Sequence, residues 1–193
     1  MTLFAGSTIK QGPPMGRPYL KLVTVLHIIS DGTVQEDFNP MHHTRDEVIE
    51  RTIQEFNLLD QLVANLYEAD WQRPVPRPET KDPWTVKDAL AHITHWKADT
   101  IRSIRGGRIP PEERGLNITD GNRLVYLRWR DRSPQEVLAW HRQVQADVLS
   151  ALRAAPEDWF TGKDRRSEWP FDLDGHLSYH REKDIEQALA EKK

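Results

Sequence analysis

The sequence predicts an all-α protein whose main domain is an antiparallel four-helix bundle. Three observations predict this fold class. Apolar residues recur at helical spacing in four segments, several of these segments open on a capping signal, and no comparable strand pattern appears after residue 44. We expect the bundle to span residues 44–193, with one short extra helix, and residues 1–43 to form a non-helical N-terminal appendage.

The appendage is rich in glycine and proline and has no helical period. Its segment YLKLVTVLHII, residues 19–29, is followed by Asp31-Gly32, which is typical of a strand and a tight turn. A lone hairpin is only marginally stable without a surface to pack on. We therefore expect residues 1–43 to be either disordered or a strand or hairpin outside the bundle.

The first two bundle helices each begin at a capping box, in which the cap and the third helical residue satisfy each other's backbone N–H groups. Thr44 with Glu47 predicts the start of the first helix, and a cluster of prolines from residue 74 onward predicts its end. Thr85 with Asp88 predicts the start of the second helix, which the pair Gly106-Gly107 ends.

The remaining helices follow a proline-containing connector. A short extra helix is expected over residues 121–131, where the sequence reads GNRLVYLRWRD. Ser133 predicts the start of the third bundle helix, because Pro134 follows it and Glu136 closes a capping box. The last helix is expected from about residue 174 to residue 190.

Composition limits the class of protein. A hydrophobic content of 37% with 30% charged residues describes a soluble globular protein, and the net charge of −3 argues against a dedicated nucleic-acid binder, whose affinity comes mainly from neutralising phosphates. The chain has no cysteine, so it forms no disulfide and offers no thiol of its own, in keeping with a cytoplasmic protein. Its longest apolar run, residues 22–29, is far too short to span a membrane.

Two histidines near the end of the chain raise the question of a metal site. His176 and His180 lie four positions apart, which on a helix is about 40° around the axis and about 6 Å along it, so both can point at one ion. The alternative is that both are polar residues on a solvated helix. An unpaired buried imidazole costs about 1–3 kcal/mol, so an inward pair needs partners.

The second helix can supply a third histidine. His92 lies between Leu90 and Ile93 on the apolar stripe, and we favour it over His95, which lies three residues further on. Three neutral imidazoles from two helices can hold a divalent ion and leave coordination positions open, which is typical of a reactive site. We expect His141, on the apolar stripe of the third helix, to be a core histidine.

Two stretches carry a resemblance to a known family. WTVKDALAHITHW, residues 84–96, and GHLSYHREKDIEQAL, residues 175–189, are similar to the second-helix and fourth-helix signatures of the DinB-like superfamily (DinB/YfiT-like proteins). That superfamily includes bacillithiol- and mycothiol-dependent transferases and isomerases and the ClbS/DfsB group. The segment before the last helix, with Trp169 and Pro170, looks more like the ClbS/DfsB and maleylpyruvate-isomerase-like branch. The resemblance implies a four-helix bundle with one metal bound by His92, His176 and His180.

These observations predict a metal-dependent hydrolase or thiol S-transferase acting on a small molecule. A divalent ion (zinc, nickel or manganese) would lower the pKa of a bound water or thiol, and any thiol must arrive as a low-molecular-weight cosubstrate. Asp88 and Asp184, each one turn from an expected ligand, are either carboxylates that orient the imidazoles or ordinary surface residues. We expect no nucleic-acid or membrane partner, and a homodimer is an open alternative to a monomer.

Two other hypotheses stay open on the sequence alone. In one, the bundle is a ClbS/DfsB-like binding or self-protection protein that holds a toxic small molecule without metal-dependent turnover. In the other, it is a bundle with no metal. Peptide hydrolysis is disfavoured, because Leu177 stands where the zinc-peptidase motif requires a glutamate after its first histidine.

Overall fold

The chain divides into two units, Met1–Pro40 and Met41–Lys193. In the computed structural model, the described residues are 26–28, 34–36, 44–76, 80–161 and 173–190. In the first unit, β1 (Leu26–Ile28) pairs antiparallel with β2 (Val34–Glu36). This pairing is the one expected of a hairpin around Asp31-Gly32, whose turn lies outside the described residues.

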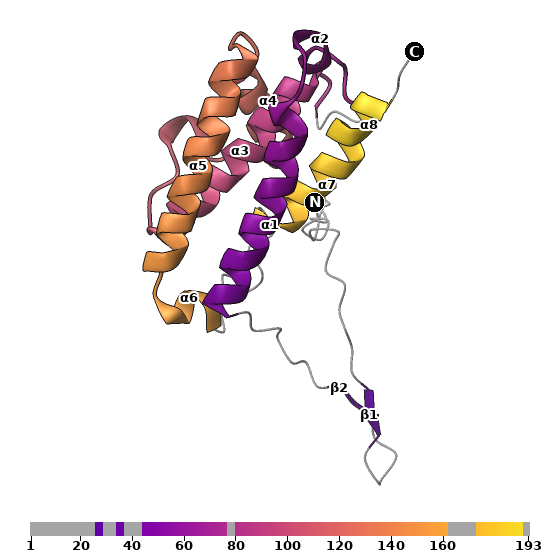
Figure 1. Ribbon diagram of the computed structural model, residues 1–193. Coiled ribbons are helices and arrows are strands. Elements are labelled where there is room, and N and C mark those ends of the chain that lie inside the picture. The colour runs from indigo at the N-terminus through magenta and orange to yellow at the C-terminus, as the bar shows by residue number, and fades with distance from the viewer. Residues whose placement is uncertain (1–25, 29–33, 37–43, 77–79, 162–172, 191–193) are drawn as a thin grey trace, which may run out of the picture. The chain divides into compact units, whose positions relative to one another are not determined.

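The described part of the second unit is helical, as Figure 1 shows. Its helices are α1 (Arg45–Ala64), α2 (Glu68–Trp71), α3 (Val86–Ile104), α4 (Ile118–Trp129), α5 (Pro134–Ala154), α6 (Glu157–Thr161), α7 (Gly175–His180) and α8 (Glu186–Ala190). A 3-10 turn covers Pro111–Glu113, and a π-helical turn, Arg181–Ile185, joins α7 to α8. The helices α1, α3, α5 and the continuous run from α7 to α8 confirm the predicted four-helix bundle, and α4 is the expected extra helix. No described helix has the length and apolarity needed to cross a bilayer.

The predicted capping boxes fix the starts of three long helices. At α1, the N–H of Glu47 donates to Thr44 Oγ1 at 3.2 Å, and the N–H of Thr44 donates to Glu47 Oε2 at 2.8 Å. Ser133 and Glu136 repeat this exchange at α5. At α3 the carboxylate of Asp88 accepts from both the backbone N–H and the hydroxyl of Thr85. Such caps stabilise a helix by about 1 kcal/mol each.

The predicted glycine stop of α3 is also confirmed. Gly106 has φ +65°, a left-handed conformation that a residue with a Cβ rarely adopts. The N–H of Gly106 donates to the carbonyl of Ser103 at 3.1 Å, and the N–H of Gly107 donates to the carbonyl of Arg102 at 2.8 Å. This pair of bonds is a Schellman motif, which satisfies carbonyls that the end of the helix would otherwise leave open.

The helix α3 is central to the bundle, because it packs against α5, α4, α7 and the π-helical turn. Almost all of its first two turns are therefore buried, polar residues included. One apolar cluster surrounds this half of α3 and includes Leu90, Ile93, Leu177 and Ile185. A polar side chain in this part of α3, such as His92, is therefore buried. Its burial costs free energy unless another group binds it there.

We expect the first unit to be dispensable for folding of the second, because the first long helix is capped by Thr44 and the unit boundary falls before Met41. A chain that begins at Met41 should keep its helical circular dichroism and melt cooperatively, with a melting temperature close to that of the full chain. Loss of both the helical signal and the cooperative transition would show that residues 1–40 belong to the core.

Candidate metal centre

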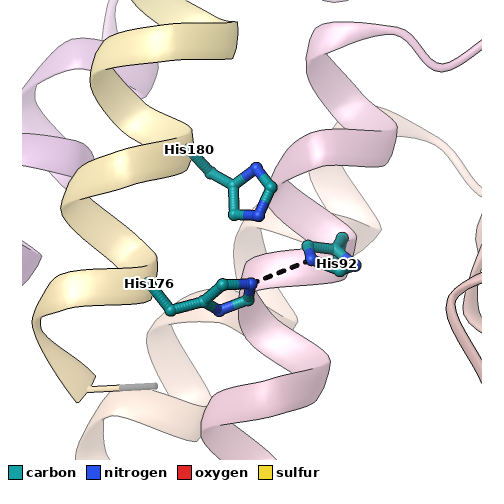
Figure 2. A group of neighbouring side chains, drawn as sticks. All are labelled: His92, His176 and His180. Atoms are coloured by element: carbon teal, nitrogen blue, oxygen red, sulfur yellow. Dashed lines mark hydrogen bonds between the residues drawn. The ribbon is translucent and has the colours of Figure 1, made fainter. Parts of the chain in front are cut away.

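The structure brings together the three histidines that the sequence analysis singled out (Figure 2). One ring nitrogen of each of His92, His176 and His180 lies within 4.8 Å of the others. His92 Nε2 and His176 Nε2 lie 3.0 Å apart. His92 and His180 are 2% and 1% exposed, whereas His176 is half-buried, so the cluster is interior on one side and reaches solvent on the other.

Apolar packing explains why α7 turns its histidines inward. Leu177 lies between the two histidines in sequence and is fully buried, as is Ile185 at the end of the π-helical turn. Both join the cluster that contains Leu90 and Ile93 of α3. Side chains three and four residues apart lie on the same face of a helix. Since Leu177 packs against α3, the neighbouring His176 and His180 also point towards α3, where His92 lies.

Burial keeps the central imidazole neutral. It lowers the pKa of His92 well below its usual range, because the charged ring would lose its hydration, and the nearby His176 and His180 lower it further. The Nδ1 atom of His92 is buried and has no hydrogen-bond partner in the described part of the chain. A neutral imidazole is the form that binds a metal.

The donor set fits a divalent ion. Ligand nitrogens bind zinc at about 2.0–2.1 Å, so two nitrogens 3.0 Å apart can share one ion. Without an ion, the two facing Nε2 atoms of His92 and His176 can share only one hydrogen between them. Imidazole suits zinc and nickel, whereas manganese prefers oxygen ligands. Three protein ligands leave a further position for water or a small molecule, as in reactive rather than closed sites.

A buried carboxylate orients the third histidine. Asp184 Oδ2 lies 2.5 Å from His180 Nδ1, and Asp184 is 2% exposed. A carboxylate only accepts hydrogen bonds, so Nδ1 of His180 carries the hydrogen. The lone pair of Nε2 can then bind a metal ion. Asp184 lies within the π-helical turn, a local widening that is frequent at functional sites. Of the two roles that the sequence left open for Asp184, orienting an imidazole and lying on the helix surface, the contact with His180 supports the first.

Asp88 takes neither of the two roles that the sequence left open for it. Its Oδ2 is engaged by Thr85 at the cap of α3, and its Oδ1 lies 3.3 Å from Lys87 Nζ. The side chain therefore closes the helix start instead of supporting His92. This is the capping role that its position three residues after Thr85 predicts.

The two carboxylates provide a matched test. Asp184→Ala should weaken divalent metal binding about 10- to 100-fold, because His180 loses the partner that fixes its ring. Asp88→Ala should leave metal affinity unchanged and lower only the free energy of unfolding, by about 3–5 kcal/mol, because it removes the cap of α3 and leaves the buried Lys87 ammonium without its carboxylate. The dissociation constants are to be measured by competition with a chromophoric chelator. Equal metal affinity in Asp184→Ala and the wild type would remove Asp184 from the site.

The other histidines of the bundle stand apart from the cluster. His95 is half-buried and packs edge-on against Trp96, with ring centres 5.4 Å apart, so the preference for His92 is supported. His141 is fully buried, stacks on Phe56 and places Nδ1 3.4 Å from Thr94 Oγ1, as expected of a core histidine. Burial, with smaller contributions from the charges of Lys97 and Arg142, lowers the pKa of His141 to about 3.

Two tryptophans next to the cluster were not anticipated as site residues. Trp84 packs on His92 with ring centres 4.9 Å apart, and Trp96 meets both His92 and His176 edge-on. The indole N–H of Trp96 donates to Asn122 Oδ1 of α4 at 3.2 Å. Their positions just before α3 and one turn after His92 are visible in the sequence, but the contact with α4 depends on tertiary packing.

A buried lysine was also missed. Lys97 is fully buried, its Nζ lies 2.5 Å from Gln145 Oε1 and 5.3 Å from the centre of the Phe56 ring, and within the described residues it forms no ion pair. Burial lowers the pKa of Lys97 from its ordinary 10.5 to about 7. The signal was present, since Lys97 lies four residues from both Ile93 and Ile101 on the apolar stripe.

Comparison with known proteins places the chain in a family. Residues 54–170, more than half of the chain, match the mycothiol maleylpyruvate isomerase N-terminal domain; this range includes His92 and ends before His176. No curated protein matches the sequence.

Two solved structures share the fold. One is an uncharacterised protein from Escherichia coli UTI89, 12% identical, covering 72% of this chain and 92% of its own, with a TM-score of 0.58. The other is the colibactin self-resistance protein ClbS in complex with a dsDNA, 12% identical, covering 78% of this chain and 98% of its own, with a TM-score of 0.56. The chain belongs to the mycothiol maleylpyruvate isomerase N-terminal domain family, within the DinB-like superfamily.

Proposed function

We propose that this protein is an enzyme in which His92, His176 and His180 hold one divalent metal ion for thiol-transfer or hydrolytic chemistry on a small molecule. The observation that carries the proposal is the convergence of three ring nitrogens, within 4.8 Å of one another, from two separate helices. Placing imidazoles together inside a bundle is costly unless something binds them. A bound ion would satisfy the inward-facing nitrogens and leave a position open.

The residues around the ion have separable roles. The three histidines would hold it, Asp184 would orient His180, and the buried ring of Trp84 would exclude water from the inner side of His92. A divalent ion in such a site lowers the pKa of water or a thiol bound to it and so supplies a nucleophile near neutral pH. The chain has no cysteine, so we infer that the thiol is a small cosubstrate, and the family's association with mycothiol supports this.

A turnover experiment tests the proposal. The zinc- or nickel-loaded protein is incubated with a low-molecular-weight thiol and an activated aryl chloride. Replacement of the chlorine by the thiol sulfur forms a thioether and releases chloride and a proton, and all three products are measured. A parallel assay follows thiol-dependent isomerisation of maleylpyruvate, the substrate in the family's name. We expect turnover in at least one assay that requires the metal and is lost in His180→Ala. Metal binding without turnover in either assay would contradict enzymatic function.

The alternative is a binding or self-protection protein that holds a small molecule without turning it over. The shared fold with ClbS motivates it, but at 12% identity that likeness extends to the fold alone. The same assays separate the two functions, because a binding protein would retain one equivalent of its ligand unchanged.

We propose that nucleic acid is not a partner of this chain. The net charge is −3, and two of the arginines on α3 and α4 are paired: Arg102 with Asp99 and Glu113, and Arg128 with Glu112 and Glu113. Paired guanidinium groups gain little by binding phosphates. A gel-shift titration with duplex DNA at physiological salt should show no specific complex.

The cytoplasmic location and the homodimer remain predictions. Sedimentation analysis of the purified protein would test the homodimer.

A further inference from the structure

We infer that Trp96 is the specificity-determining wall of the metal centre and that the protein favours small thiols with an aromatic group next to the sulfur. This inference rests on the proposed function, since it concerns what approaches the ion. It is carried by the difference in exposure between the two tryptophans that contact His92 and by the hydrogen bond that fixes one of them.

The exposures indicate the side from which a small molecule arrives. Trp84 is 2% exposed and closes the inner side of His92. Trp96 and His176 are both half-buried, and their rings meet edge-on with centres 6.5 Å apart. The ring of Trp96 also lies edge-on to His92, with centres 6.3 Å apart. A molecule that reaches the three nitrogens from the side on which His176 is exposed therefore meets the indole of Trp96.

The indole is held in one orientation. Its N–H donates to Asn122 Oδ1 at 3.2 Å, and Asn122 is itself 2% exposed on α4. The extra helix α4 thus supplies the acceptor for the one polar atom of Trp96, which leaves the faces and edges of the ring as the contact surface. A rigid aromatic wall presents a large apolar area at little cost in side-chain entropy, which is how binding sites gain selectivity for flat ligands.

The chemistry of the wall selects the ligand class. Aromatic rings attract one another in offset or edge-to-face arrangements beyond their apolar burial, whereas a saturated ring of similar size gains only the burial. A thiol whose sulfur reaches the centre places the group next to the sulfur against Trp96. The side chain lies one turn after His92 and is not a ligand, so its removal should change ligand preference without changing metal affinity.

The experiment compares phenylmethanethiol with cyclohexylmethanethiol, which differ only in the ring. Both are titrated into protein loaded with Co(II), which takes imidazole ligands and absorbs in the visible range. The absorption change on thiol addition gives each dissociation constant. We expect the aromatic thiol to bind about two- to tenfold more tightly in the wild type. Trp96→Leu should bind both thiols alike while retaining the Co(II) affinity of the wild type.

Two further variants keep the test decisive. Trp159→Leu removes another half-buried tryptophan, one that packs in the second apolar cluster, and should keep the preference. Asn122→Ala leaves the indole in place but unanchored and should reduce the preference. Failure of the wild type to bind Co(II) would overturn both this inference and the proposed function. Binding of Co(II) and of both thiols with equal affinity, or a preference that survives in Trp96→Leu, would overturn this inference alone.

Discussion

Saturating zinc or nickel is expected to raise the free energy of unfolding of the metal-free protein by about 4 kcal/mol at a thousandfold excess over Kd. This corresponds to a rise in melting temperature of about 10 °C for a chain of this size. The physical reason is mass action, because an ion held by His92, His176 and His180 binds the folded state alone. Thermal melts with and without a strong chelator measure the shift.

The metal-free bundle should still fold, since its apolar clusters are complete without the histidines. In this it differs from a zinc finger, which is unfolded without its ion. His180→Ala should abolish most of the metal-dependent shift. His141→Ala removes a histidine that is equally buried but outside the cluster, so it should lower the melting temperature while keeping the shift. A shift that persists in His180→Ala would place the ion elsewhere.

Replacing Lys97 with methionine is expected to stabilise the protein by about 5 kcal/mol at most near pH 6. The ammonium group is fully buried and, within the described residues, donates to a single acceptor, Gln145 Oε1, and has no carboxylate paired with it. Methionine fills a similar volume and has no charge to desolvate. The equilibrium free energy of unfolding, from urea titrations of both proteins, measures the difference.

The effect should depend on pH in a defined direction. Lys97 titrates near its ordinary 10.5 in the unfolded chain, and burial lowers its pKa to about 7 in the folded protein. Between these values the unfolded chain binds more protons, so stability rises as pH increases from about 7 to about 10.5. Lys97→Met should lack this rise. The folded pKa of His141, about 3 against an ordinary 6.5, adds a separate rise between those values, which Lys97→Met should keep in reduced form because burial is the main cause and the Lys97 charge only adds to it.

A surface lysine provides the control. Lys183 is exposed on the π-helical turn, and Lys183→Met should keep both the stability and the pH dependence of the wild type. A stability of Lys97→Met that is lower than that of the wild type at pH 6 would show that the ammonium is better accommodated than its single acceptor suggests.

Local signals made the helix starts predictable. Thr44, Thr85 and Ser133 each act with an acidic residue three positions later, so the information lies within one turn of the chain. The end of α3 at Gly106 is local in the same sense, because the left-handed backbone there selects glycine. The short helices α2 and α6 were missed, because neither begins at a serine or threonine; at α2 the N–H of Tyr67 donates to Asp70 Oδ2 at 3.1 Å, but tyrosine is not a usual cap.

The histidine cluster was predictable because its geometry is mostly periodic. The spacing of His176 and His180 fixes their common face, and the apolar neighbours of His92 fix its inward direction. What periodicity cannot supply is the contact between side chains on different helices. The packing of Trp96 on Asn122 and the placement of Lys97 beside Gln145 depend on how α3 meets α4 and α5.

The last helix shows most clearly which structural features the sequence pattern does not predict. Its sequence predicts one continuous helix, and the run from α7 to α8 is continuous, but it contains the π-helical turn Arg181–Ile185. Within that turn, Asp184 pairs with His180, and Arg181 pairs with Glu55 of α1. Intrinsic propensity does not encode such a widening, because it is set by tertiary partners.

Metal content is the most direct test of the central claim that His92, His176 and His180 hold one ion. The protein is produced without an affinity tag, loaded with zinc or nickel, passed through a desalting column and subjected to elemental analysis alongside a His92→Ala, His176→Ala, His180→Ala triple variant. We predict about one equivalent of metal per wild-type chain and essentially none in the variant. Equal metal content in the two proteins, or none in either, would contradict the claim.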